Sequence, residues 1–373
     1  MVGLGEKIMT KKTPFYERHL ALGAKLVDFA DFLMPINYSG VNHEHMQVRE
    51  NVGVFDVSHM GEFYVEGEKA EDYLQSITIN NVKALNDGQA QYTAMCYPDG
   101  GIIDDFLIYR FHKNKFMLAV NASNIAKDYA WAEKHLIDGA SLRDCSDETA
   151  LLAIQGPNTL KVLQKLTNTK LTDIPFYHFC EGILAGKKLL ISRTGYTGEP
   201  GFELYHKPQD SLELWDSIFE AGDDIGIEAV GLAARDTLRL EMKYILYGND
   251  IDKNTNPLEA GLGWITKLDN DDFIAKETLL KIKKEKPSQR LIAFKMVDRG
   301  IPRHDYQLYI ANEKVGKVTS GTMSPSLKIG IGMGYVKREL AKVGTEIDMD
   351  VRGKRLKAII VKPPFVNSSP MNL

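Results

Sequence analysis

The sequence is short of cysteine, of long apolar runs and of positive charge, and each shortage excludes a class of protein. It has three cysteines, Cys96, Cys145 and Cys180, in 373 residues, and no C-x-x-C pair. They are interpreted as reduced thiols of a cytoplasmic protein. No apolar run approaches the roughly 18 residues that span a bilayer, so no membrane association is expected. The formal net charge of −4 argues against a nucleic-acid partner, because such proteins normally carry a basic patch.

The N-terminus shows no targeting signal. The stretch MVGLGEKIMTKKTPFYERHL has neither the apolar core of a signal peptide nor the Arg and Ser bias of a transit peptide. Its first eight residues are interpreted as an extension before an alternative start at Met9. What is present is an ordinary globular composition, 44% hydrophobic and 26% charged. At 373 residues the chain is too long for one typical core, so two or three domains are expected.

The first half of the chain predicts a mixed unit with a largely antiparallel sheet. Residues 13–60 are expected to mix short helical stretches with loops. Beyond them we expect strands at residues 61–67 and 115–121, a hairpin over 91–111, and helices at 68–77 and 122–136.

The second half predicts a similar unit followed by an all-β one. From residue 149 onward we expect helices at 157–167, 209–222 and 231–248, and strands at 183–193 and 201–206. A basic stretch with a proline at 281–289 predicts a linker. Short segments between glycine- and proline-containing turns at 289–364 predict a small β-barrel or sandwich.

Two neighbouring carboxylates, Asp104 and Asp105, stand near the head of the apolar run in CYPDGGIIDDFLIYRF. Residues 98–101 are turn-forming, and a strand is expected from Ile102 onward. Adjacent strand residues point to opposite faces of a sheet, so the two carboxylates cannot share one site. Because burying an unpaired carboxylate is costly, an acid here needs a partner, a turn to cap or a chemical role. Capping of the turn is the simplest account.

A third carboxylate, Glu203, ends the glycine-rich segment RTGYTGEPGFEL. The spacing of its glycines could suggest a phosphate loop, but the Lys-Ser/Thr of a Walker loop is absent and a glycine-rich hairpin loop is expected. Glu203 lies in an apolar strand, where a rigid carboxylate can accept paired hydrogen bonds from an N–H/NH₂ edge such as that of a pterin. A solvent-facing glutamate is the alternative.

The helix predicted at 231–248 carries Arg235 and Arg239 on one face. The two guanidinium groups can clamp an anion, or they can pair with Asp236 and Glu241 as ordinary surface charge.

The histidines do not predict a metal site. In the HEH sequence at residues 43–45 the two rings diverge on a helix, and no Cys/His cluster follows. His59 is interpreted as structural. Nucleophile motifs such as G-x-S-x-G are absent. The residues considered singly therefore name no reaction.

Eight segments nevertheless occur in a characteristic order and spacing. They are TPFYERHLALGAKLVDFADFLMPINY, VRENVGVFDVSHM, GGIIDDFLIY, AIQGPN, GYTGEPGFE, GLAARDTLRLE, YGNDID and TSGTMSPSL. Together they resemble the aminomethyltransferase, or T-protein, family of the glycine cleavage system. The resemblance covers residues 13–366, nearly the whole chain.

The resemblance implies a specific activity. A T-protein receives an aminomethyl group from the lipoyl arm of a separate H-protein. With tetrahydrofolate as cosubstrate it yields 5,10-methylenetetrahydrofolate, ammonia and the dihydrolipoyl H-protein. Lipoylated H-protein and tetrahydrofolate are therefore the expected partners of a monomer without a metal site.

The same resemblance implies a fold. It is an α+β, three-domain clover-leaf, with two mixed domains around a central folate channel and a small C-terminal β-barrel. The first domain is expected from residues 1–60 and 140–225, the second from 61–139 and 226–280, and the barrel from 288–373.

The family's site residues are carried over by motif. Asp104 matches the catalytic aspartate and is expected to face the channel, while Asp105 turns away. Such a carboxylate would orient the reacting folate nitrogens, accept a proton or stabilise a cationic carbon. Folate-binding positions are matched by Glu203 and Arg235, and channel-lining positions by Asn121, Met60, Tyr196 and Trp264. The C-terminal PPFVNSSPMNL lacks the Tyr or Arg that the family often has near the folate, so no C-terminal ligand is carried over.

Two alternatives share the folate-binding module. One is another folate-dependent one-carbon or demethylating enzyme, such as the folate domain of sarcosine- or dimethylglycine-oxidising proteins. These proteins add a flavin domain, whose G-x-G-x-x-G fingerprint is absent here. The other is a non-enzymatic folate-binding relative that serves iron–sulfur assembly. Such relatives carry a cysteine in a K-G-C-Y-x-G-Q-E stretch, and the corresponding TGYTGEPGFE has none.

Overall fold

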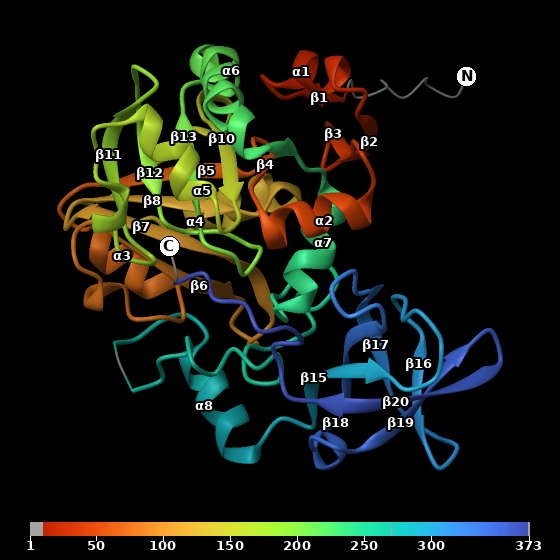
Figure 1. Ribbon diagram of the computed structural model, residues 1–373. Helices are drawn as coiled ribbons and strands as arrows, with labels where there is room; N and C mark the ends of the chain where they lie inside the picture. Colours follow the sequence, from red (N-terminus) through yellow and green to blue (C-terminus); the bar gives the residue numbers. More distant parts are fainter. Residues whose placement is uncertain (1–9, 270, 372–373) are drawn as a thin grey trace, which may run out of the picture.

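The computed structural model describes residues 10–269 and 271–371, so the extension predicted for residues 1–8 lies outside the described residues. Within them, the strands form a three-stranded, a five-stranded and a six-stranded sheet and one closed barrel. Figure 1 shows the barrel, in blue, as a separate body at one end of the molecule. The mixed α+β class and the C-terminal barrel agree with the prediction. No helix among the described residues is long and apolar enough to cross a membrane.

The five-stranded sheet is antiparallel throughout, as the sequence predicts. Its strands run in the order β6 (Gln89–Cys96), β7 (Ile102–His112), β8 (Lys115–Val120), β5 (Gly61–Glu66) and β9 (Ser141–Asp144). Helices α3 (Ala70–Ile77) and α4 (Ile125–Lys134) cover one face of this sheet, because their apolar side chains pack with those of β5, β7 and β8 in one core. The predicted hairpin and both predicted helices of this unit are confirmed.

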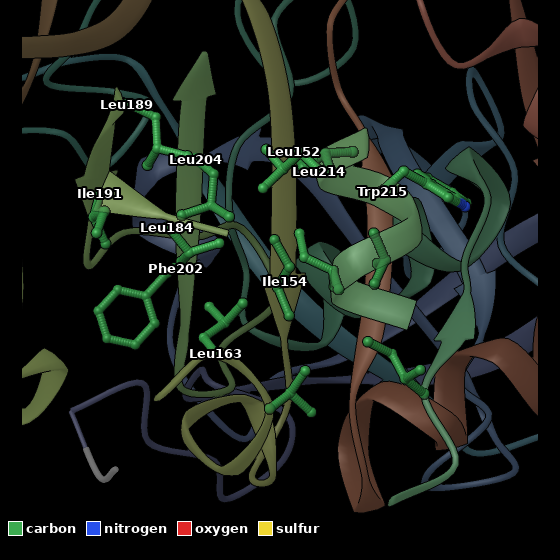
Figure 2. Close-up of a cluster of buried hydrophobic side chains, with 14 of the residues drawn as sticks. Leu152, Ile154, Leu163, Leu184, Leu189, Ile191, Phe202, Leu204, Leu214 and Trp215 are labelled. Atoms are coloured by element: carbon green, nitrogen blue, oxygen red, sulfur yellow. The ribbon is translucent and has the colours of Figure 1, made fainter. Parts of the chain in front are cut away.

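The six-stranded sheet takes its strands from distant parts of the chain. Their order is β11 (Phe179–Leu184), β12 (Lys187–Ser192), β13 (Gly201–His206), β10 (Ala150–Gln155), β4 (Gly53–Asp56) and β14 (Glu228–Ala229). Helices α5 (Thr159–Leu163) and α6 (Ser211–Gly222) pack on one face. Figure 2 shows this core, with Leu152 and Ile154 of β10 close to Leu214 and Trp215 of α6.

Three predicted elements are wrong in extent, each for a local reason. The strand expected at 183–193 is two strands, because Ala185 and Gly186 adopt positive φ angles of 50° and 75° in a tight turn. The helix expected at 231–248 is α7 (Leu232–Glu241), since Lys243 has a φ of 61° and the chain then bends back. The linker expected at 281–289 is largely helical, because α8 (Lys276–Glu285) extends into it.

The remaining elements lie at the two ends of the chain. The N-terminal part forms β1 (Lys11–Lys12), α1 (Tyr16–Ala21), β2 (Lys25–Phe29), β3 (Phe32–Asn37) and α2 (Val41–Glu50). The prediction of helical stretches and loops over residues 13–60 is therefore wrong in part, because β2 and β3 pair as antiparallel strands and β4 joins the six-stranded sheet. The barrel is built from β15 (Gln289–Met296), β18 (Gly330–Lys337), β17 (Glu313–Met323), β16 (Gln307–Ile310), β19 (Glu346–Val351) and β20 (Lys354–Val361).

An apolar layer, here called the inter-sheet cluster, joins the two large sheets. It includes Tyr109 and Met117 from the five-stranded sheet and Leu151 and Tyr205 from the six-stranded one. Helix α7 contributes Leu238 to it and also contacts β17 of the barrel. Polar side chains that point toward this cluster therefore come from both sheets and from α7, although their sequence positions are far apart.

Candidate functional site

The alternation of side chains along β7 decides which way its two aspartates point. Phe106 and Ile108 belong to the core under α3 and α4, whereas Leu107 and Tyr109 pack in the inter-sheet cluster. Because successive strand residues alternate in direction, Asp104 faces the helix-covered side and Asp105 faces the other sheet.

The expected orientation of the pair is therefore reversed. Asp104, which the resemblance predicts to face the site, is fully buried and receives hydrogen bonds from Asn121 (2.9 Å) and Asn124 (2.6 Å) on the α4 side. The two carboxylates do occupy opposite faces, as predicted. Neither caps the preceding turn, because Asp99 Oδ1 accepts the hydrogen bond from the Gly101 backbone N–H at 3.0 Å.

Asp105 is hydrogen-bonded by Tyr92 and Asn121 and lies beside two stacked aromatic rings. The Tyr92 hydroxyl donates to its Oδ2 at 2.6 Å, and the Asn121 amide lies 3.3 Å from its Oδ1. Trp264, 63% exposed, stacks on Tyr92 with 6.0 Å between ring centroids. Burial, and next the charge of Asp104, raise the pKa of Asp105 to about 7. A carboxyl group that titrates near neutrality can act as a general acid or base at physiological pH.

Glu203 of β13 points toward the same inter-sheet space. It shares strand parity with Tyr205, which belongs to the inter-sheet cluster, and only 8% of its surface is exposed, so the solvent-facing alternative is wrong. The Thr194 hydroxyl donates to Oε2. Burial raises the pKa of Glu203, while the Thr194 hydrogen bond and the charge of Arg235 oppose that rise.

Arg235 and Arg239 of α7 have different surroundings. The Arg235 guanidinium lies over the Tyr196 ring, 4.6 Å from its centroid, and interacts electrostatically with Glu203. Arg239 instead pairs with Asp236 at 2.7 Å, as predicted, and with Asp250 at 2.8 Å, but it is buried rather than on the surface. The two arginines therefore do not form one anion clamp.

The other predicted residues line the same region. The Tyr196 hydroxyl donates to the Ile245 carbonyl oxygen, and its ring stacks on Tyr244 with 5.6 Å between centroids. Met60 packs against the inter-sheet cluster. Next to it His59 is buried, and this burial, together with the charge of Arg235, lowers its pKa to about 4. His59 is therefore neutral at pH 7.

Several residues of this region were not found from the sequence. They are Tyr92, Tyr109, Thr194 and Tyr205, which hydrogen-bond Asp105, Glu203 or one another. A tyrosine or threonine in a strand is also a common packing residue, so none carries a signal alone. The sequence signal that could have found two of them is the spacing along the strand. Tyr109 follows Asp105 by four residues and Tyr205 follows Glu203 by two, so each tyrosine points to the same face of its sheet as that acid.

Two family models match nearly the whole chain. The GCVT N-terminal domain matches residues 15–270, and the glycine cleavage T-protein C-terminal barrel domain matches residues 289–367. The chain is 56% identical to the aminomethyltransferase of Bacteroides fragilis over 358 residues, which cover 95% of this chain and 99% of that protein. It is 50% identical to the aminomethyltransferase of Halothermothrix orenii over 356 residues, covering 95% and 100% respectively.

A solved structure gives the same result. The glycine cleavage system aminomethyltransferase T from Bartonella henselae superposes with a TM-score of 0.91 at 33% identity. The superposition covers 96% of this chain and 99% of that one.

Proposed function

The chain belongs to the glycine cleavage T-protein family and is an aminomethyltransferase, and from this premise we infer how its residues serve the reaction. We propose that it transfers the methylene carbon of an aminomethyl group on the lipoyl arm of H-protein to tetrahydrofolate. The products are 5,10-methylenetetrahydrofolate, ammonia and dihydrolipoyl H-protein.

The polar groups between the sheets fit a reduced pterin. Glu203 uses one oxygen for Thr194, and no donor in the described ranges bonds the other. The Arg235 side chain has no acceptor among the same residues, only the Tyr196 ring beneath it. The remaining carboxylate oxygen of Glu203 can accept hydrogen bonds from an N–H/NH₂ edge, and the Arg235 guanidinium can donate to a neighbouring carbonyl oxygen. Glu203 and Arg235 are therefore assigned to the pterin, with Met60, Tyr196, Asn121 and Trp264 around it.

The reactive end of the site is assigned to Asp105 rather than Asp104. This assignment is carried by one observation: Asp105 points toward the space that Glu203 and Arg235 also face, whereas Asp104 points away from it. Tetrahydrofolate supplies the nitrogen nucleophile that takes up the one-carbon unit as ammonia leaves. Asp105 orients that nitrogen region, accepts a proton and stabilises positive charge on the carbon.

The wider arrangement follows from the same family. We propose a cytoplasmic monomer of three domains around a central folate channel, with residues 1–60 and 140–225, residues 61–139 and 226–280, and residues 288–373 as the three units. Its support is that β4 joins β10–β13 in one sheet while β5–β8 form the other. The bounds shift by a few residues, because β9 pairs with β5 and β14 pairs with β4. Fixing two large cosubstrates in such a channel can contribute roughly 7–11 kcal/mol through proximity.

An ammonia-release assay with aminomethylated H-protein tests the function and the site together. Release by the unchanged protein should require both H-protein and tetrahydrofolate. Asp105→Asn should lose at least about 10²-fold in turnover while still binding tetrahydrofolate, as for a lost acid/base group. Asp138→Asn, at an exposed turn position, is the matched control.

The outcomes separate the proposed function from its rivals. Turnover of a small methylated amine without H-protein would favour a folate-dependent demethylating enzyme. Binding of tetrahydrofolate without any turnover would favour a non-enzymatic folate-binding protein. Full activity of Asp105→Asn would refute the catalytic assignment and leave the family untouched.

A further inference from the structure

One buried carboxyl group, on the far side of β7 from the proposed site, has no hydrogen-bond donor for either oxygen among the described residues. Asp128 lies in the first turn of α4 and is fully buried. Neither of its oxygens accepts a hydrogen bond from a donor group in residues 10–269 or 271–371. Because an isolated buried carboxylate is strongly disfavoured, Asp128 is expected to keep its proton.

The group that faces Asp128 is the carboxylate of Asp104. The Asp104 carboxylate lies close enough to Asp128 to raise its pKa, second only to burial, and two neighbouring carboxyl groups share a proton rather than both ionising. Asp104 is the acceptor of the pair, because it also receives the backbone N–H of Asn121 at 3.1 Å, the Asn121 amide at 2.9 Å and the Asn124 amide at 2.6 Å. The proton therefore belongs to Asp128, and the pair carries one negative charge.

Asn121 connects this pair to the opposite face of the strand. Its Nδ2 lies 2.9 Å from Asp104 Oδ1, 2.9 Å from the carbonyl oxygen of Asp105 and 3.3 Å from Asp105 Oδ1. An amide nitrogen carries two hydrogens, so it can hold both aspartates at once. A change at Asp104 is thus transmitted to Asp105 by a direct contact.

We propose that Asp104 and Asp128 share one proton and, through Asn121, position Asp105 for the reaction. They are positioning residues, because they lie on the helix-covered face and do not point toward the site. This proposal rests on the function assigned to Asp105 above.

The charge of the pair also acts on Asp105, whose pKa it helps to raise. Removing the Asp104 charge should therefore lower the pKa of Asp105. Replacing the neutral Asp128 by asparagine should leave that pKa unchanged, because the pair keeps its single charge. The other titratable groups nearby, which both variants retain, are Tyr92 and Tyr196 facing Asp105 and Lys127 and Tyr247 facing the pair.

The pH profile of ammonia release by the full-length protein distinguishes these effects. Asp104→Asn should move the acid limb to lower pH by about one unit, as expected for the loss of a nearby like charge. Asp128→Asn should leave the limb in place, since its amide still donates to Asp104. Asp138→Asn is the control. Equal shifts in Asp104→Asn and Asp128→Asn would mean that both acids are ionised, and no shift in Asp104→Asn would mean no coupling to Asp105; either result overturns the proposal.

A spectroscopic measurement tests the shared proton without activity. The infrared difference spectrum between the unchanged protein and Asp128→Asn at pH 8 should contain the carbonyl stretch of a protonated carboxyl group. Its absence would overturn the proposal even if Asp104→Asn fails to fold. Should Asp105→Asn keep full turnover, the function assigned to Asp105 fails, while the infrared band still reports on the pair.

Discussion

A shared proton between Asp104 and Asp128 makes the stability of this protein depend on pH in an unusual direction. In the unfolded chain Asp128 ionises with an ordinary pKa of about 3.9. In the folded protein burial, and then the neighbouring Asp104, raise its pKa far above that value. The folded state therefore binds one more proton than the unfolded state above about pH 4, so the group's contribution to stability is present below that pH and is lost as pH rises.

Asp128→Asn removes the titrating group, and the resulting change in the free energy of unfolding can be worked out. Keeping Asp128 protonated costs about 1.4 kcal/mol for each pH unit above about 4, or about 4 kcal/mol at pH 7. Asparagine avoids that cost but brings one extra N–H into the buried site, and an N–H left there without an acceptor costs about 1–3 kcal/mol at every pH. The variant should therefore be the less stable protein near pH 4 and the more stable one, by about 1–3 kcal/mol, at pH 7.

Urea unfolding followed by circular dichroism between pH 4.5 and pH 8 measures the effect, with Asp138→Asn run beside it in the same buffers. The test is how the difference in unfolding free energy between the variant and the unchanged protein changes with pH. The cost of the extra N–H is the same at every pH and so does not affect this slope. Plots of unfolding free energy against pH that stay parallel for the variant and the unchanged protein would refute the shared proton. We expect the plots for Asp128→Asn and the unchanged protein to cross, and the plot for Asp138→Asn to stay parallel to that of the unchanged protein.

Two further predictions concern the pterin site and the buried ion pair between Arg239 and Asp250. Glu203→Gln should weaken tetrahydrofolate binding by roughly 10–100-fold, the loss of a charge-assisted hydrogen bond, and isothermal titration calorimetry that finds unchanged affinity would contradict the assignment. Arg239→Met should destabilise the protein to urea by about 3–5 kcal/mol, because it leaves the buried Asp250 carboxylate without its cation. Adding Asp250→Asn should recover part of that loss; a double variant no more stable than Arg239→Met would show that the ion pair is not the cause.

The sequence predicts most elements of this fold because periodicity and turn chemistry are local. The hairpin around residues 98–101 is specified by its Pro-Asp-Gly-Gly turn, and α3 by its amphipathic pattern. The end of α7 is not predictable in this way. Arg239 at this end donates to the Tyr244 carbonyl oxygen at 3.0 Å and also to the Ser320 hydroxyl of β17 at 2.9 Å, and the second bond is a tertiary contact that no local pattern shows.

The orientation of Asp104 and Asp105 fails for a different reason. Parity along a strand identifies a buried face only when the other face is polar. In β7 both faces are apolar, with Phe106 and Ile108 on one side and Leu107 and Tyr109 on the other. The alternation correctly predicts that the aspartates separate, but it cannot say which of them meets Glu203. That depends on which face α3 and α4 cover.

The adjacency of the two acids has a physical consequence that a single aspartate could not supply. Side chains on opposite faces of a strand are normally isolated from each other by the sheet itself. Asn121 escapes this isolation because it follows the last residue of β8, where pairing with β7 ends: continuing the β7–β8 register places it opposite Asp105, yet its backbone N–H donates to Asp104. A residue at the end of a strand can thus contact both faces, and the Asp104–Asp128 pair can influence the opposite face without occupying space there. Asn121→Ala should for this reason move the acid limb of ammonia release to higher pH, opposite to Asp104→Asn, because the Asn121 hydrogen bond lowers the pKa of Asp105 while the Asp104 charge raises it.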